Sequence, residues 1–175
     1  MTSTGLPDTE PALLPEREVL TWETFPLAVR DLARQVVDSG FVPDVVIAVA
    51  RGGLVPGGAM AYALGTKGVG TLNVEFYTDV GKTLDDPRVL PPLMDTSDLP
   101  GTKVLVVDDV ADSGRTLALV MDLLGKQGAE ARSAVLFTKP RTIVQPDYSW
   151  KDTDLWITFP WSAEPPVTGA RSIDA

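Results

Sequence analysis

The most informative segment of this chain reads Val104-Leu105-Val106-Val107-Asp108-Asp109-Val110-Ala111-Asp112-Ser113-Gly114-Arg115-Thr116. The apolar run from 104 to 107 indicates a strand buried on both faces, as in parallel sheets. Two adjacent carboxylates follow it, and a turn of small and polar residues then opens a helix. Because backbone N–H groups and hydroxyls converge at such a turn, the segment predicts a phosphate-binding turn with acidic residues at its rim.

A plainer interpretation of the same residues is available. Asp112 or Ser113 could simply cap the helix, and Asp108 and Asp109 could be a solvated strand end. Two other phosphate-binding motifs are excluded, because the sequence contains neither G-x-x-x-x-G-K-[ST] nor G-x-G-x-x-G.

The residues on either side alternate between helical and strand patterns. Apolar residues at helical spacing, with Thr21 as a possible cap and Gly40 as a stop, predict a first helix on Trp22, Phe25, Val29, Leu32 and Val36. We expect strands at 45–50, 71–77, 103–107, 133–138 and 155–159, and further helices at 57–64 and 116–126. This order predicts one α/β domain with a mainly parallel sheet flanked by helices, which binds ligands beyond the carboxyl ends of the strands.

Three segments fall outside these periodic patterns. Residues 78–102 contain four prolines and no sustained period, so we expect a long flexible loop that serves as a lid, with Glu75 and Tyr77 at its root. Residues 1–17 are expected to be a disordered leader and 166–175 a mobile tail, which leaves 18–165 as the domain.

The composition limits the kinds of ligand. The 175 residues include no cysteine and no histidine, so any metal should be hard and oxygen-bound, such as Mg²⁺. A formal net charge of -9 without a basic patch argues against nucleic-acid binding. The sequence has no run long enough to span a bilayer and no signal-peptide pattern, so we expect a cytoplasmic protein without a membrane partner.

Two more segments carry polar or aromatic residues at strand ends. Arg51, Gly52 and Gly53 follow the strand at 45–50; glycines permit close backbone approach to a ligand, and arginine offers a planar fork for phosphate. Lys139 follows the strand at 133–138, and Trp156 and Ile157 lie in the last strand. Taken singly, these residues are typical of a tight turn, a solvated lysine and a core aromatic.

The segment from 104 to 116 resembles the 13-residue signature of type I phosphoribosyltransferases. The resemblance implies a single-domain fold of that family, in which Ala111, Asp112, Ser113, Gly114, Arg115 and Thr116 hold the 5′-phosphate of 5-phosphoribosyl-1-pyrophosphate (PRPP). It also implies that Asp108 and Asp109 reach the ribose hydroxyls, directly or through Mg²⁺. Arg51, Gly52 and Gly53 resemble the pyrophosphate loop of the family, where a cis peptide often occurs; here it would fall at Ala50-Arg51.

The segment that contains Lys139, Trp156 and Ile157 resembles the base-binding edge of the bacterial xanthine-guanine phosphoribosyltransferases. In that comparison Lys139 donates to the 6-oxo group of a purine, Trp156 stacks on the ring, and the backbone near Ile157 meets its other edge. The resemblance covers most of residues 20–161, but not the leader, the tail or the proline-rich loop.

The resemblance implies an enzyme of purine salvage, a pentosyl-transferring glycosyltransferase. Guanine, xanthine or hypoxanthine would displace pyrophosphate from PRPP with Mg²⁺ as cofactor, and Asp112 would accept the proton of the attacking nitrogen. A homodimer or higher homo-oligomer is expected. Two alternatives stay open: a regulatory protein that senses a nucleotide or PRPP on this fold, and a phosphoribosyltransferase for another base.

Overall fold

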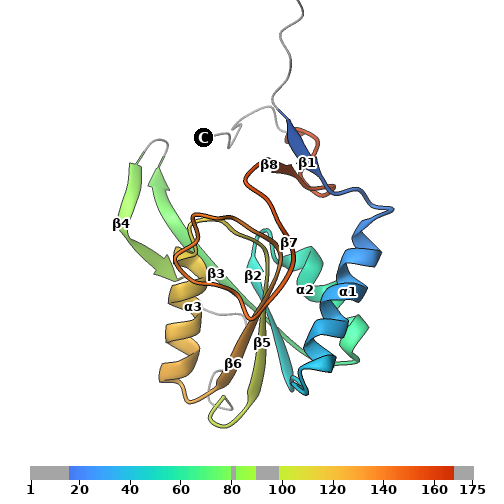
Figure 1. Cartoon of the computed structure of the whole chain (residues 1–175). Helices are drawn as coiled ribbons and strands as arrows, with labels where there is room; N and C mark the ends of the chain where they lie inside the picture. The colour runs from blue at the N-terminus through green and yellow to red at the C-terminus, as the bar shows by residue number, and fades with distance from the viewer. Residues whose placement is uncertain (1–15, 80–81, 90–98, 168–175) are drawn as a thin grey trace, which may run out of the picture.

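The computed structural model describes residues 16–79, 82–89 and 99–167, with side chains for 16–74 and 99–167. Among these residues, six strands form one sheet with the order β4-β3-β2-β5-β6-β7, and β1 and β8 pair in a separate two-stranded sheet (Figure 1). The five neighbouring strands β3, β2, β5, β6 and β7 are parallel to one another, and β4 is antiparallel to β3. In chain order the elements are β1 Arg17–Val19, α1 Phe25–Asp38, β2 Val45–Ala50, α2 Leu54–Leu64, β3 Gly68–Asp79, β4 Lys82–Val89, β5 Lys103–Ala111, α3 Arg115–Lys126, β6 Glu130–Thr138, β7 Tyr148–Asp152 and β8 Trp156–Thr158.

The predicted α/β architecture with a mainly parallel sheet is confirmed. Alternate residues of β5 enter different cores: Leu105 and Val107 pack with α1 and α2, whereas Val104 and Val106 pack with α3. All four are fully buried. Helices α1 and α2 lie on one face of the sheet, and α3 lies on the other (Figure 1). Each β5 side chain in this run therefore packs against a helix, which explains why the run is continuously apolar.

The first helix begins later than predicted. Its first residue is Phe25, and Thr24 is its N-cap residue, not Thr21. The two threonines bond each other instead: the Thr21 N–H donates to Thr24 Oγ1 at 3.1 Å, and the Thr24 N–H donates to Thr21 Oγ1 at 3.3 Å. Trp22 therefore precedes the helix and is 54% exposed rather than buried in the apolar stripe.

Three strands were not predicted: β1, whose first residue Arg17 was assigned to the leader, and the edge strands β4 and β7. β4 occupies 82–89, within the segment expected to be an irregular loop, and pairs with β3 in an irregular register. Pro87 argued against a strand, but an edge strand tolerates proline because one side needs no ladder bond. β7 alternates Tyr148 and Trp150 with polar residues, a pattern typical of an edge strand with one covered face. Of the segment expected to be a lid, residues 78–102, the stretches 80–81 and 90–98 lie outside the described residues, as do the side chains of Glu75 and Tyr77.

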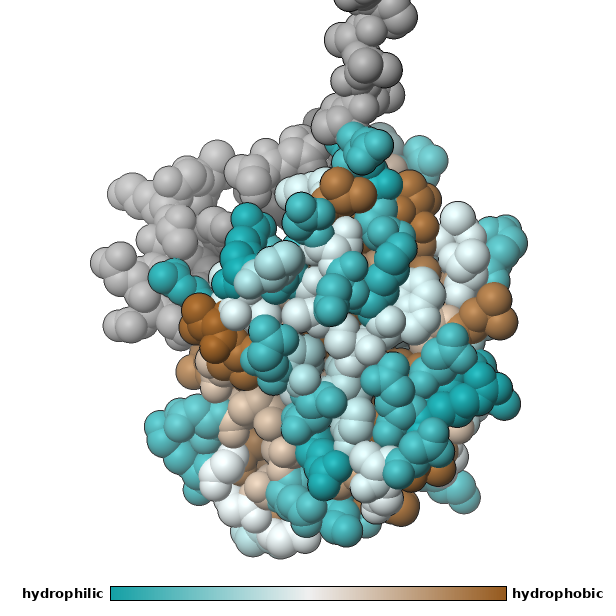
Figure 2. Space-filling model, viewed as in Figure 1, coloured by the Kyte–Doolittle hydropathy of each residue, from teal (hydrophilic) through white to brown (hydrophobic). Residues whose placement is uncertain are grey.

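The surface seen in Figure 2 is mostly hydrophilic, with apolar residues in small separate groups. Scattered apolar residues of this kind are usual on proteins surrounded by water. In the part of the chain that the structure describes, no helix is both long and apolar enough to cross a membrane.

Candidate active site

The acidic pair lies within β5, because this strand continues to Ala111 and does not end at Val107. The Asp109 N–H donates to Asp108 Oδ1 at 2.9 Å, and both side chains are half-buried. Burial raises the pKa of the Asp108 carboxyl well above its usual range, and the neighbouring Asp109 carboxyl adds to this rise. Burial also raises the pKa of Asp109 to about 6, although hydrogen bonds from Val110 N–H, the Asp108 side chain and Trp161 oppose the rise. Among the described residues no ion pair joins either carboxylate to a basic side chain, and carboxylate oxygens are ligands that suit a hard cation.

The turn after β5 leads directly into α3. Gly114 is the N-cap residue, with a positive φ of 75°, and no side chain makes a cap hydrogen bond. Only a long contact of 3.4 Å joins the Arg115 N–H to Ser113 Oγ. Neither Asp112 nor Ser113 is therefore the N-cap residue that the plainer interpretation expected. The turn encloses a small pocket lined by Asp108, Val110, Ala111, Asp112, Ser113, Gly114, Thr116, Leu117 and Val135.

The segment that follows β6 supports this turn from one side. The Lys139 N–H donates to the Ala111 carbonyl at 3.0 Å, and the Ile143 N–H donates to the Ser113 carbonyl at 3.0 Å. A Cβ atom on Gly114 would overlap the Thr142 hydroxyl, so only glycine fits this close approach. These contacts join the predicted phosphate turn to the segment that begins at Lys139, directly after β6.

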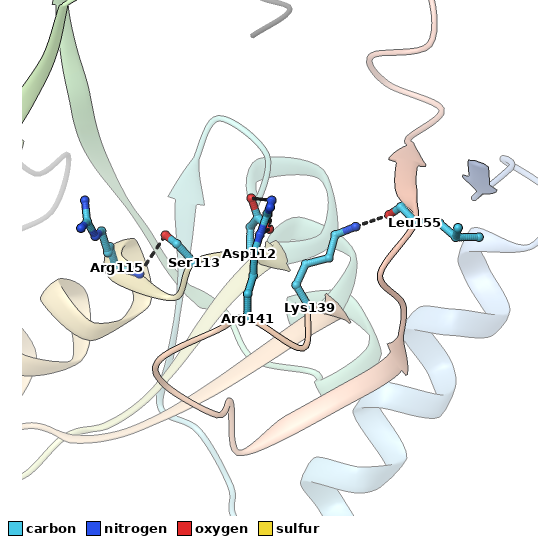
Figure 3. A network of polar contacts seen from close by, with 6 residues as sticks. All are labelled: Asp112, Ser113, Arg115, Lys139, Arg141 and Leu155. Atoms are coloured by element: carbon cyan, nitrogen blue, oxygen red, sulfur yellow. Dashed lines mark hydrogen bonds and ion pairs between the residues drawn. The ribbon is translucent and has the colours of Figure 1, made fainter. Parts of the chain in front are cut away.

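Arg141, which the sequence interpretation missed, belongs to the same supporting segment. Its Nε donates to Asp112 Oδ1 at 2.7 Å and a terminal guanidinium nitrogen donates to Oδ2 at 2.6 Å (Figure 3). The two residues are 29 positions apart. No motif pointed to Arg141, because its partner is identified only when β5 and β6 are known to be neighbours.

The glycine loop after β2 lies against the acidic pair. Its Ala50-Arg51 peptide bond is cis, as predicted. A Cβ atom on Gly52 would overlap the Asp109 carboxylate, and one on Gly53 would overlap the carbonyl oxygens of Val49 and Val107. The predicted pyrophosphate loop and the predicted ribose site are therefore in direct contact, and the glycines permit it.

The third predicted segment lies at the same end of the sheet. Lys139 is only 9% exposed, and its ammonium donates to the Leu155 carbonyl (Figure 3). Trp156 begins β8 and is 58% exposed, whereas Ile157 is partly buried and packs on the core. Lys139 is thus directed towards the strand that carries the aromatic ring.

Trp161 is a second residue that the sequence interpretation did not single out. Its ring stacks on Phe159 with a centroid separation of 5.0 Å and an interplanar angle of 16°. It also meets Phe25 edge-on at 5.5 Å, and its side chain lies close enough to Asp109 to lower the pKa of that carboxyl. Trp161, which follows β8 after two intervening residues, therefore lies between the aromatic cluster at the start of α1 and the acidic pair of β5.

A parallel sheet with a glycine loop, an acidic pair and the predicted phosphate turn at the ends of β2 and β5 agrees with the phosphoribosyltransferase fold that the sequence resemblance implied. The family model for the phosphoribosyl transferase domain matches residues 16–167, and the chain belongs to this family. It is similar to the xanthine-guanine phosphoribosyltransferases of Ruegeria sp., at 34% identity over 81% of this chain and 83% of the relative, and of Gluconobacter oxydans, at 30% over 83% and 84%. Among solved structures, the purine phosphoribosyltransferase from Pyrococcus horikoshii is 37% identical with a TM-score of 0.73, over 86% of this chain and 97% of that one.

Proposed function

We propose that this enzyme transfers the 5-phosphoribosyl group from PRPP to a 6-oxopurine, with Mg²⁺, in cytoplasmic purine salvage. The observation that carries the proposal is the backbone hydrogen bond from Lys139 N–H to the Ala111 carbonyl. It links a buried lysine, suited to a 6-oxo group, with the turn that contains Asp112. The names of the curated relatives, which are xanthine-guanine phosphoribosyltransferases, support the same choice of base.

The donor would bind along the ends of β2 and β5. The turn residues Asp112 to Thr116 supply hydroxyls and backbone N–H groups for the 5′-phosphate, and the start of α3 favours an anion there. Asp108 and Asp109 would meet the ribose hydroxyls. Arg51 and the N–H group of Gly52 would hold the pyrophosphate as negative charge develops on it. The Gly53 N–H already donates to the Val49 carbonyl at 2.8 Å, so Gly53 would contribute its lack of a side chain rather than a donor.

The residues of the site fit a magnesium ion shared with the donor. Asp108 and Asp109 are the carboxylates that would hold it, directly or through water; burial raises the pKa of both, and the neighbouring Asp109 carboxyl adds to the rise at Asp108. Within the described ranges no group of three or more acidic side chains forms a complete metal site. Oxygens of the donor would therefore complete the coordination. When bound, Mg²⁺ neutralises charge on the departing pyrophosphate.

The base would bind on the other side of the turn. Lys139 donates to its 6-oxo group, Trp156 offers a ring for stacking, and the backbone at Ile157 meets its far edge. A ring nitrogen forms a bond to C1 of the ribose as the bond from C1 to the pyrophosphate oxygen breaks. The proton of that nitrogen passes to the Asp112 carboxylate.

The direct test is release of pyrophosphate from PRPP with a panel of purine and pyrimidine bases. Turnover with guanine, xanthine or hypoxanthine supports the proposal. Turnover with another base alone would indicate a different phosphoribosyltransferase, and binding of PRPP without turnover of any base would indicate a regulatory protein.

We further propose that the enzyme forms a homodimer or higher homo-oligomer, which analytical sedimentation would test.

Asp112→Asn is expected to lower kcat by about 10² while the KM for PRPP changes little. The amide cannot accept the proton, whereas the hydroxyls and N–H groups of the turn remain, and a positioned acid-base group contributes about 10² to 10⁴ in rate. Steady-state kinetics with guanine would measure both constants. A variant that keeps its full kcat but loses affinity for PRPP would show that Asp112 has a structural role.

Gly52→Ala is expected to raise the KM for PRPP about tenfold, which corresponds to ~1.4 kcal/mol of binding free energy. The new methyl group displaces the Asp109 carboxylate from the donor site. Thermal unfolding should change little, because the overlap is with the end of one side chain. Gly58→Ala is the matched control: a Cβ there meets nothing within 4 Å, so its kinetics should equal those of the wild type. Equal KM values for the two variants would contradict the placement of PRPP beside Asp109.

A further inference from the structure

The pairing of Arg141 with Asp112 is a feature that the proposed mechanism does not use. The guanidinium donates from two nitrogens to the two oxygens of one carboxylate, at 2.7 and 2.6 Å (Figure 3). Planar two-point contacts of this kind define the orientation of a carboxylate as well as its position. A lysine in the same place would offer a point charge without that geometry.

The energetics indicate that this ion pair does not serve mainly to stabilise the fold. The Arg141 and Asp112 side chains are 70% and 47% exposed. Ion pairs as exposed as this contribute about 0 to 1 kcal/mol to stability, because water screens the charges and two long side chains lose freedom. The Arg34–Asp31 pair on α1 is comparable, at 2.8 Å with side chains 67% and 53% exposed, and lies outside the site.

The backbone that carries Arg141 is well supported. Thr142 N–H donates to the Lys139 carbonyl at 3.1 Å, and hydrogen bonds to Ala111 and Ser113 tie both ends of the segment to the phosphate turn. The guanidinium therefore approaches Asp112 from a segment that is attached to the turn on both sides of Asp112. This attachment fixes the backbone that carries Arg141 relative to Asp112, so that the guanidinium reaches the carboxylate from a constant position.

The geometry also leaves Asp112 able to accept a proton. A carboxylate has about two lone-pair sites on each oxygen, and the arginine uses one on each. The remaining site on either oxygen is available to the ring N–H of a base. Without the guanidinium the carboxylate can rotate about its side-chain torsions, so fewer encounters with the base have the required alignment.

We propose that Arg141 is a positioning residue for the proton transfer, acting through Asp112 by holding its carboxylate in the plane that faces the base. This inference rests on the proposed function, because it requires Asp112 to be the proton acceptor. Arg141 itself needs no contact with either substrate. Its effect should therefore appear in kcat and should depend on an intact carboxylate at position 112.

The test is a double-mutant cycle with Arg141→Ala, Asp112→Asn and the combined variant, measured as kcat and KM for guanine and PRPP. Arg141→Ala should lower kcat about tenfold, with the KM for PRPP and the unfolding temperature unchanged. In the Asp112→Asn background the same substitution should cause no further loss, since residues that act through one group are not additive. Arg34→Ala, the matched control for loss of an exposed paired arginine, should leave kcat at the wild-type value.

Two further measurements separate positioning from a merely structural role. Millimolar guanidinium chloride should restore part of the kcat of Arg141→Ala, whereas sodium chloride at equal ionic strength should not. Arg141→Lys should be intermediate, because it keeps the charge but cannot form the two-point contact.

An unchanged kcat in Arg141→Ala, or a full tenfold loss again in the combined variant, would overturn the inference while leaving the proposed function intact. Full activity of Asp112→Asn would instead remove Asp112 as the proton acceptor, and with it both the proposed mechanism and this inference.

Discussion

Adenine is expected to be used with a kcat/KM about 10⁴ below that of the best of guanine, xanthine and hypoxanthine, because sites built to hydrogen-bond one substituent reject analogues that lack it. A lysine ammonium has three donors and no acceptor. Lys139 is 9% exposed, and one of its donors is already bonded to the Leu155 carbonyl. The oxygen of a 6-oxo group can accept a hydrogen bond from another N–H of this ammonium. A 6-amino group would instead place its own N–H groups against a buried cation that has no acceptor.

Lys139→Met tests the same contact from the side of the protein. The substitution keeps most of the length of the side chain, which becomes one atom shorter, but removes all three donors and leaves the Leu155 carbonyl without this partner. Turnover of 6-oxopurines should be lost while PRPP binding, measured by calorimetry, is retained. Weak base binding should persist, because stacking on Trp156 does not depend on the 6-substituent.

The control for this variant is Lys126→Met, which removes an exposed lysine at the end of α3 that pairs with Asp122. Its kcat/KM should equal that of the wild type for every base. If adenine gave a kcat/KM equal to or above that of all three 6-oxopurines, the choice of base would be wrong. The assignment of the chain to the phosphoribosyltransferase family would still hold, because it rests on the match over residues 16–167.

Chelation of divalent metal is expected to reduce pyrophosphate release to background, and added Mg²⁺ should restore it. The chain has no histidine and no cysteine, so its ligands are oxygens, which suit magnesium rather than zinc. Asp108 and Asp109 have raised pKa values and lie beside the glycine loop, where a cation would balance their charge. Zinc should therefore not be required.

The measurement compares EDTA with EDTA that has been saturated with magnesium beforehand. Only free EDTA should inhibit, which separates loss of metal from any direct effect of the chelator. Asp109→Asn should in addition raise the Mg²⁺ concentration that gives half-maximal rate, because it removes one charged ligand. Full activity in rigorously metal-free buffer would exclude the metal from the reaction.

The regular elements in the interior of the sheet were predictable from sequence because burial determines their composition. The run at 45–50 is strand β2 with the predicted bounds, and the run at 103–107 is the first part of β5. The edge strands β4 and β7 were missed, since an edge strand tolerates polar residues and proline. The start of α1 was misplaced because Thr21 and Thr24 both fit a cap; in the structure they bond each other across a turn that precedes the helix, which begins at Phe25.

By itself the sequence predicted which local segments would carry chemistry: the acidic pair, the expected phosphate turn, the glycine loop with its cis peptide, and Lys139. Each is encoded within a few consecutive residues, where backbone preferences and motif spacing act. The tertiary structure alone decided the partners of these groups. Gly52 meets Asp109, Trp161 lies near Asp109, and Arg141 pairs with Asp112. These contacts join residues from different strands and loops, so they exist only once hydrogen bonding places β2, β5 and β6 side by side.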